Sequence, residues 1–257
     1  MRLPSAPLSR RTCLGSLSLL GWAPLTASAA EDTVLYSYHL KPPYLDLTRK
    51  EGLYYELADL LSLRVPGLRC RVEYLPRRRL EADLVAGRLR GAILGVHPTW
   101  FRDAERSRYL WTPPVMRDAD VVVSRHDHPV AYTGPDSLVG VRMALPRGYY
   151  YAGIEELVQA GRIPREESES DETALMMLSL GRADATVITR RTLYTLLARR
   201  PGLRGRFHVA PKPHDEYERH ILVPHDQPAL HKQLSEGVAL LARDPAWQGR
   251  LQEQSLR

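Results

Sequence analysis

Two kinds of hydrophobic pattern alternate along the chain. Short runs of apolar and β-branched residues, which are typical of buried strands, occur at 33–38, 70–75, 92–96, 121–124, 139–145, 185–189 and 220–223. Between many of these runs, apolar residues recur with the spacing of one helix face, at 53–61, 80–85, 154–158, 175–178, 193–197 and 230–241. Strands that alternate with helices predict an α/β fold with mostly parallel sheets.

One internal similarity bears on the domain organisation. Residues 84–93 and 178–187 both contain the end of a helix, a Gly-Arg pair and an apolar strand. In each pair the glycine supplies the left-handed residue that ends a helix. A helix–strand unit that occurs twice suggests two similar lobes. The same pattern is also ordinary chemistry for a helix-to-strand connection, so both interpretations stay open at this point.

Residues 1–29 have the composition of a targeting segment. They contain Arg2, Arg10 and Arg11 but no acid, a broken apolar stretch at 13–25, and small residues at 27–29 that match a cleavage site. We therefore expect a secretory signal peptide at 1–29 and a periplasmic location. The Arg10-Arg11 pair resembles the twin-arginine export motif. An ordinary signal that happens to contain two arginines is the alternative.

The charge of the chain changes once this segment is set aside. The formal net charge is +6, and half of it comes from the three arginines of the expected signal, so the remaining chain is only weakly basic. We therefore expect no nucleic-acid partner. The hydrophobic fraction of 44% and the charged fraction of 26% are ordinary for a globular protein. No apolar run after residue 30 is long enough to span a membrane.

The sequence contains no metal or cofactor signature. His126 and His128 alternate, and on a strand they would share one face, but no second pair of ligands accompanies them. The motifs of phosphate-binding loops, serine hydrolases and zinc proteases are also missing. We therefore expect no metal and no cofactor. Cys70 is the only cysteine outside the expected signal, and we expect it to be a buried apolar residue at the edge of a strand.

Several short motifs follow one another at a characteristic spacing. They are Pro42-Pro43-Tyr44, the helix opening at 52–58, Thr99-Trp100-Phe101-Arg102, the aromatic and proline segment at 109–114, the segment at 137–140 and Gly181-Arg182-Ala183-Asp184-Ala185. In this order they resemble the bacterial periplasmic solute-binding proteins that serve polar amino-acid ABC transporters, also called family 3 extracellular solute-binding proteins. The resemblance covers about residues 33–250.

The resemblance implies a type II periplasmic-binding-protein fold, an α/β fold with two lobes. Lobe 1 would contain 30–122 and 218–257, and lobe 2 would contain 123–217. Two crossover segments near 121–124 and 218–223 would join the lobes, and hinge closure would enclose a small solute in the cleft between them. The implied partners are a small carboxylate-bearing ligand and an inner-membrane ABC permease, with the protein itself a monomer.

The resemblance also implies which residues hold the ligand. Arg102 matches the arginine that binds the ligand carboxylate, a role suited to a planar guanidinium with paired N–H donors. Thr99 would present a hydroxyl or fix the same loop. Tyr44 would form an aromatic wall, and the backbone N–H of Gly148 would complete the carboxylate site, with Tyr149 in place of a small hydroxyl residue. Surface exposure is the alternative for Arg102, and core packing is the alternative for Tyr44.

Two departures from the family bear on the ligand. The family fixes the ligand's ammonium with carboxylates at two positions, which by register fall at Tyr38 and Thr189 in this chain. Neither side chain is charged, and an ammonium that is buried without an anion costs several kcal/mol. We therefore expect a carboxylate-bearing solute, an amino acid or a related organic acid, that need not be an α-amino acid.

Two other functions use the same fold. A few members of the family are periplasmic dehydratases of cyclic acids, of the cyclohexadienyl-dehydratase type. His39, Glu56 and His97 are the only candidates for acid–base chemistry near the motifs, and none has a clear partner, so we expect a binding protein and not an enzyme. The third function is that of an accessory or sensory module that binds a solute without transport.

Overall fold

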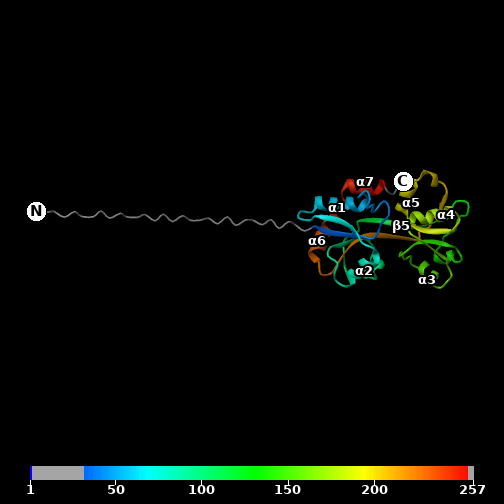
Figure 1. The fold of residues 1–257 in the computed structure, drawn as a ribbon, viewed down its shortest axis with the longest axis horizontal. Helices are drawn as coiled ribbons and strands as arrows, with labels where there is room; N and C mark the ends of the chain where they lie inside the picture. Colours follow the sequence, from blue (N-terminus) through cyan, green and yellow to red (C-terminus); the bar gives the residue numbers. More distant parts are fainter. Residues whose placement is uncertain (2–31, 254–257) are drawn as a thin grey trace.

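The computed structural model of the protein describes Met1 and residues 32–253. Apart from Met1, the expected signal peptide at 1–29 lies outside the described residues. Two α/β portions lie side by side, and strands β5 and β10 pass between them (Figure 1). Among the described residues, no helix has the length and apolar character needed to cross a membrane.

The first portion is built on a mostly parallel sheet. Its strands follow the order β2 (Cys70–Tyr74), β1 (Thr33–Ser37), β3 (Ala92–Val96) and β10 (Asp215–Val223), with β10 antiparallel to β3. The short strand β4 (Leu110–Trp111) also pairs with β10. Every residue of β3 is buried, as expected for a strand that helices cover on both faces.

Helices cover both faces of this sheet. Helices α1 (Leu53–Arg64), α6 (Pro228–Leu241) and α7 (Pro245–Glu253) pack on one face, and helix α2 (Arg77–Val85) and the 3₁₀ helix η1 (Pro98–Phe101) pack on the other. Leu53, Leu57 and Leu61 of α1 are all buried, which confirms the helix face that their spacing predicts. The periodicity in the sequence did not predict α7.

The second portion repeats this plan. Its strands follow the order β5 (Met116–Arg125), β8 (Ala185–Thr189), β6 (Met143–Pro146) and β7 (Arg165–Ser168), and β9 (Phe207–Val209) pairs with β5. Helix α3 (Ile154–Gln159) and the 3₁₀ helix η2 (Pro135–Leu138) lie on one face. Helices α4 (Asp171–Ser179) and α5 (Arg190–Arg199) lie on the other, and the 3₁₀ helix η3 (Pro201–Leu203) follows α5.

Strands β5 and β10 connect the two portions. They pair antiparallel over Met116–Asp120 and Asp215–Arg219. Beyond this shared segment, β5 continues along β8 in the second portion and β10 continues along β3 in the first. The lobe boundaries that the sequence suggested, at 122/123 and 217/218, fall inside these two strands. A change in the angle between the portions would therefore be made at this strand pair.

Candidate functional site

A narrow cleft lies where the two portions meet. The first portion contributes Tyr38, His39, Lys41, Arg77 and Trp100, the second contributes Tyr149, Tyr150, Tyr151 and Thr189, and the connecting strands contribute Asp120, Tyr217 and Arg219. The free volume inside is about 30 Å³, which is room for about one or two water molecules and not for an amino acid. The cleft is therefore closed in this conformation.

A larger and more open hollow lies at the same pair of strands. Its volume is about 680 Å³, and its lining includes Arg117, Arg190 and Glu216. The side chains of Arg117 and Glu216 are exposed. In the narrow cleft, by contrast, buried polar groups and aromatic rings converge from both portions, which is the usual character of a ligand site. For that reason we place the functional site in the narrow cleft.

Three of the residues expected from the sequence line this cleft. Tyr38 follows β1, Tyr149 follows β6, and Thr189 is the last residue of β8. All three therefore lie at or just after the carboxyl ends of parallel strands, where ligands of open α/β sheets bind. Tyr38 and Thr189 are buried and Tyr149 is half-buried.

Two further expected residues lie beside the cleft and not in its lining. Tyr44 is fully buried in the core of the first portion, and its hydroxyl donates a hydrogen bond to Asp118 Oδ2. The core-packing alternative for Tyr44 therefore describes its position. Gly148 precedes Tyr149 with a left-handed backbone (φ 81°) and is exposed, so its place in the fold is to turn the chain into the cleft.

Arg102 and Thr99 require a correction, because the structure places neither of them in the cleft. Arg102 ends η1 with a left-handed backbone (φ 54°) and an exposed side chain. Thr99 is also exposed, and its Oγ1 lies 2.8 Å from His97 Nδ1. Both side chains are therefore in solvent. Trp100, between them, faces the cleft.

Arg219 forms the floor of the cleft. Its guanidinium is buried and donates to Asp118 Oδ2 (2.9 Å), to the backbone oxygen of Gly95 (2.8 Å) and to the Tyr217 hydroxyl (3.0 Å). The rings of Tyr44 and Tyr217 lie 4.5 and 5.1 Å from its central carbon. These contacts use most of its donors, so Arg219 holds β10 against the first portion.

Lys41 crosses the cleft from the first portion to the second. Its Nζ lies 3.1 Å from Asp171 Oδ2 and donates to Thr189 Oγ1 at 3.0 Å. The same nitrogen stands 4.8 Å from the centre of the Tyr149 ring. Burial alone would lower the pKa of Lys41, but the Asp171 carboxylate, with Tyr149 and Asp120, outweighs it, so the pKa of Lys41 is raised and the side chain is an ammonium.

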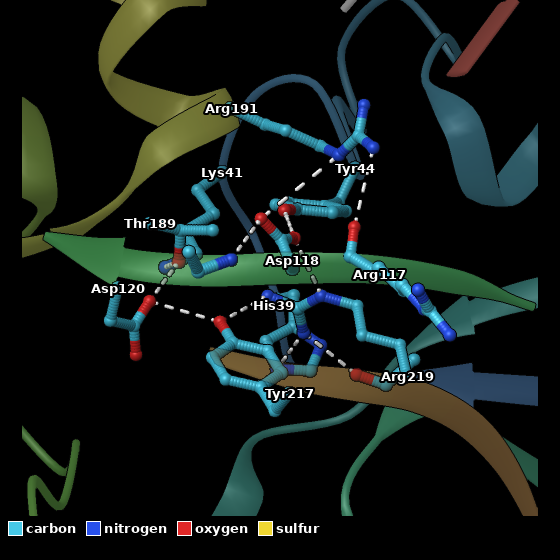
Figure 2. Close-up of polar contacts among 12 residues, drawn as sticks. His39, Lys41, Tyr44, Arg117, Asp118, Asp120, Thr189, Arg191, Tyr217 and Arg219 are labelled. Carbon is cyan, nitrogen blue, oxygen red and sulfur yellow. Dashed lines mark hydrogen bonds and ion pairs between the residues drawn. The ribbon is translucent and has the colours of Figure 1, made fainter. Parts of the chain in front are cut away.

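Asp120 is a cleft carboxylate that the sequence interpretation missed. Its Oδ1 accepts hydrogen bonds from Thr189 Oγ1 and from the Tyr217 hydroxyl, both at 2.9 Å. Figure 2 shows its other oxygen pointing away from both donors. Burial raises the pKa of Asp120, and the charges of Lys41 and Arg219 oppose that rise. Lys41, Thr189 and Asp120 thus form a chain of polar contacts along one wall of the cleft.

The opposite wall combines an arginine with aromatic rings. Arg77 begins α2, and its guanidinium donates to Glu81 Oε1 (2.8 Å) and to the backbone oxygen of Trp100 (2.9 Å). Its central carbon lies 5.3 Å from the centre of the Tyr38 ring. The Tyr38 hydroxyl is buried and has no hydrogen-bond partner within the described chain. A buried hydroxyl without a partner next to a cation fits a ligand anion.

His39 lies beneath this wall. Its Nδ1 is 3.3 Å from the Tyr54 hydroxyl, and its Nε2 is 3.5 Å from Arg219 Nη1. Burial, and then the positive charges of Arg219 and Lys41, hold the pKa of His39 well below its usual range, so the imidazole is neutral. Across residues 32–253, no three His, Cys, Asp or Glu side chains gather as a metal-binding group.

The sequence contains only weak indications of the site residues that the sequence interpretation missed. Asp118 and Asp120 are separated by one residue, and a strand places such a pair on one face. The predicted strand began at 121, whereas β5 begins at Met116. Lys41 and Asp171 are distant in sequence, and each alone has the character of an ordinary surface charge. Only the fold brings them together.

Sequence comparison gives no relative for this chain: no protein-family model matches it, and no curated protein matches it. Solved structures match its fold. The substrate-binding protein of an amino acid ABC transporter superposes with a TM-score of 0.67 at 16% identity, over 88% of this chain and 99% of that protein. The GluR0 ligand-binding core in complex with L-glutamate superposes with a TM-score of 0.72 at 12% identity, over 88% and 99%.

A third similar structure comes from a signalling protein. A histidine kinase sensor domain, described as similar to periplasmic binding proteins, superposes with a TM-score of 0.69 at 19% identity, over 88% of this chain and 96% of that domain. At such low sequence identity, these structural similarities show the fold of this chain and do not show its function. The fold is the type II periplasmic-binding-protein fold, as the motifs in the sequence suggested.

Proposed function

We propose that the protein binds a small carboxylate-bearing solute in the cleft between its two lobes and delivers it to an inner-membrane ABC permease. One observation carries the proposal: polar and aromatic side chains from both portions converge over the two strands that join them. A solute that touches both walls favours the closed arrangement by the difference in its contacts between the open and closed states. The permease then recognises the closed shape.

The proposal also places the protein in the periplasm and assigns it no enzymatic activity. The segment at 1–29 supports export to the periplasm, which is where such a permease would meet the protein. His39 is neutral and enclosed by Tyr54 and Arg219, which supports a packing role for the only histidine in the cleft lining. A binding protein without an enzymatic step is therefore the function that we propose.

The chemistry of the cleft supports an acid as the solute. Arg77 lies at the wall, and an arginine binds a carboxylate through paired hydrogen bonds. The unpaired Tyr38 hydroxyl supplies one further donor. The ring of Trp100 lines the cleft and is suited to pack against the apolar part of the solute. These groups take over the role that the sequence assigned to Arg102. Because the cleft is closed, entry of the solute requires the lobes to rotate apart at β5 and β10.

Calorimetric titration with a panel of amino acids and simple organic acids tests the proposal. We expect at least one carboxylate-bearing solute to bind the wild-type chain with a stoichiometry of one. Arg77→Gln should weaken that binding at least tenfold. The matched control is Arg78→Gln, on the same helical turn with an exposed side chain, and it should bind as the wild type does. Equal binding by both variants would remove Arg77 from the site.

A sensory role is the second candidate, and the likeness to a histidine kinase sensor domain favours it. The same cleft would bind the same solute, and the closed form would dock on a signalling partner instead of a permease. Stimulation of the ATPase activity of the proposed ABC transporter, reconstituted in vesicles, distinguishes the two roles. Stimulation that depends on solute and on this protein supports transport, and its absence alongside solute binding supports sensing.

A further inference from the structure

The wall formed by the second portion carries the groups that recognise a primary ammonium. Asp171 at the start of α4 supplies a carboxylate, Thr189 at the end of β8 supplies a hydroxyl oxygen, and Tyr149 supplies the face of a ring. An ammonium has three N–H donors and no acceptor, and its charge is attracted to a ring face. Three separate elements of the second portion thus converge on one point.

The ammonium on which these three elements converge belongs to Lys41 of the first portion. Lys41 stands in the loop between β1 and α1, and its ammonium reaches across the cleft to Asp171 and Thr189. Figure 2 shows Lys41 meeting Thr189 on the side of β5 where Asp120 lies. The side chains of Lys41 and Asp171 are 7% and 4% exposed. The contact is therefore a buried ion pair between the lobes, and it is screened much less than an exposed pair.

The acceptors on this wall exceed what Lys41 uses. Asp171 Oδ1 is buried and has no hydrogen-bond partner within the described chain. Buried carboxylate oxygens are nearly always paired in native proteins, so Oδ1 is an unused acceptor for the N–H donors of an ammonium that takes the place of Lys41. This unpaired oxygen is evidence for a ligand subsite, independent of the contacts that Lys41 makes.

We propose that Asp171, Thr189 and Tyr149 form a subsite for a primary ammonium, and that Lys41 is its built-in occupant. Two consequences follow. Lys41 holds the lobes together when no solute is bound, and it excludes solutes whose own ammonium would need the subsite. The wild-type chain therefore selects acids without an α-ammonium. The inference rests on the proposed solute-binding function for this selectivity, but the subsite itself can be tested with simple amines.

Removal of the lysine side chain and rescue with a free amine test the subsite. Lys41→Ala in the chain without residues 1–29 should unfold at a lower temperature than the wild type. n-Propylammonium at millimolar concentrations should raise its melting temperature by several degrees and leave the wild type unchanged. Tetramethylammonium, which has the charge but no N–H donor, should not rescue it. The control is Lys232→Ala, which replaces an exposed lysine on α6. It should melt at the same temperature as the wild type and show no response to amines.

A second variant separates loss of the subsite from a general loss of stability. Lys41→Ala with Asp171→Asn should not respond to n-propylammonium. In small-angle scattering, Lys41→Met, which keeps the aliphatic stem, should have a larger radius of gyration than the wild type. Amine effects that are equal in wild type and Lys41→Ala, or a Lys41→Met variant as compact as the wild type, would overturn the inference.

The outcomes for the inference and for the proposed function are distinguishable. If no solute binds the wild type but n-propylammonium still rescues Lys41→Ala, the function is wrong and the subsite stands. If an acid binds the wild type but the amine has no selective effect, the function stands and the subsite is wrong. Tight binding of ordinary α-amino acids to the wild type, unchanged in Lys41→Ala, contradicts the selectivity.

Discussion

Asp118 and Arg219 form a buried ion pair across the two strands that join the lobes. Arg219 Nε donates to Asp118 Oδ2 at 2.9 Å, and both side chains are 1% exposed. They are diagonal neighbours, because Asp118 is directly opposite Tyr217 in the strand register. Tyr44 donates to the same carboxylate. The floor of the cleft is therefore fixed to the loop that carries Lys41.

Asp118→Asn should lower the free energy of unfolding by about 3–5 kcal/mol, because it leaves a buried guanidinium without its counter-ion. Urea denaturation followed by circular dichroism measures the change. The control is Glu218→Gln, which breaks an exposed pair with Arg117 on the same strands and should alter the stability by less than about 1 kcal/mol. A similar small effect for Asp118→Asn would show that the pair does not stabilise the strands.

Thr189→Val should break the link that the Thr189 hydroxyl makes between Lys41 and Asp120. The substitution keeps the shape of the side chain and removes the hydroxyl that accepts from Lys41 and donates to Asp120. We expect a loss of about 1–3 kcal/mol, since two buried polar side chains each lose a hydrogen-bond partner. The same denaturation experiment on Thr133→Val, an exposed threonine of the same portion, is the control and should show almost no change.

The stability of the protein should fall in mild acid, and His39 should contribute to that fall. Burial and nearby positive charges lower its pKa in the folded chain, so the unfolded chain binds more protons and the free energy of unfolding decreases as the pH drops below about 6.5. Burial also lowers the pKa of His97, His214 and His220, and these residues act in the same direction.

Urea denaturation at pH 7.5 and pH 5.0 measures the contribution of His39. The difference in stability between the two pH values should be smaller in His39→Asn than in the wild type. The control is His126→Asn, which replaces an exposed histidine. Its free energy of unfolding should differ between the two pH values by as much as that of the wild type. An unchanged difference in His39→Asn would show that His39 is not held neutral in the folded chain.

Arg102→Gln should have little effect on solute binding or on stability. The side chain is exposed and lies outside the cleft, so we expect the affinity to stay within about twofold, and surface changes of this kind typically alter stability by less than about 0.5 kcal/mol. Titration with the solute that binds the wild type, together with denaturation, measures both. A loss of binding with intact stability would restore Arg102 to the site.

Local patterns predicted most of the buried framework. The runs at 92–96 and 185–189 correspond to β3 and β8, because strands covered on both faces are buried throughout and are therefore rich in apolar and β-branched residues. The strand predicted at 139–145 began four residues too early, since the chain turns before Met143 begins β6. Strand β7 was missed, because its sequence is polar and it lies at the edge of its sheet.

The site was harder to predict than the framework. Tyr38 and Thr189 were placed by register with the resembled family, and each is the last residue of a predicted strand, so the strand pattern fixed the register. Arg102 was placed by a motif, and a motif does not specify the backbone conformation of the residue that ends a 3₁₀ helix, which is left-handed at Arg102 and leaves its side chain exposed. Lys41 and Asp171 meet only because two lobes close on each other, and no local pattern in the sequence contains that information.

Native mass spectrometry tests the binding of a solute in the cleft most directly. The protein without residues 1–29 is mixed with a small-molecule extract of the periplasm, and the retained species is released and identified. We predict one carboxylate-bearing species at a ratio of one per chain, retained by the wild type and by Arg78→Gln but lost from Arg77→Gln. Retention of no species by the wild type, or equal retention by both variants, would contradict a carboxylate site in the cleft.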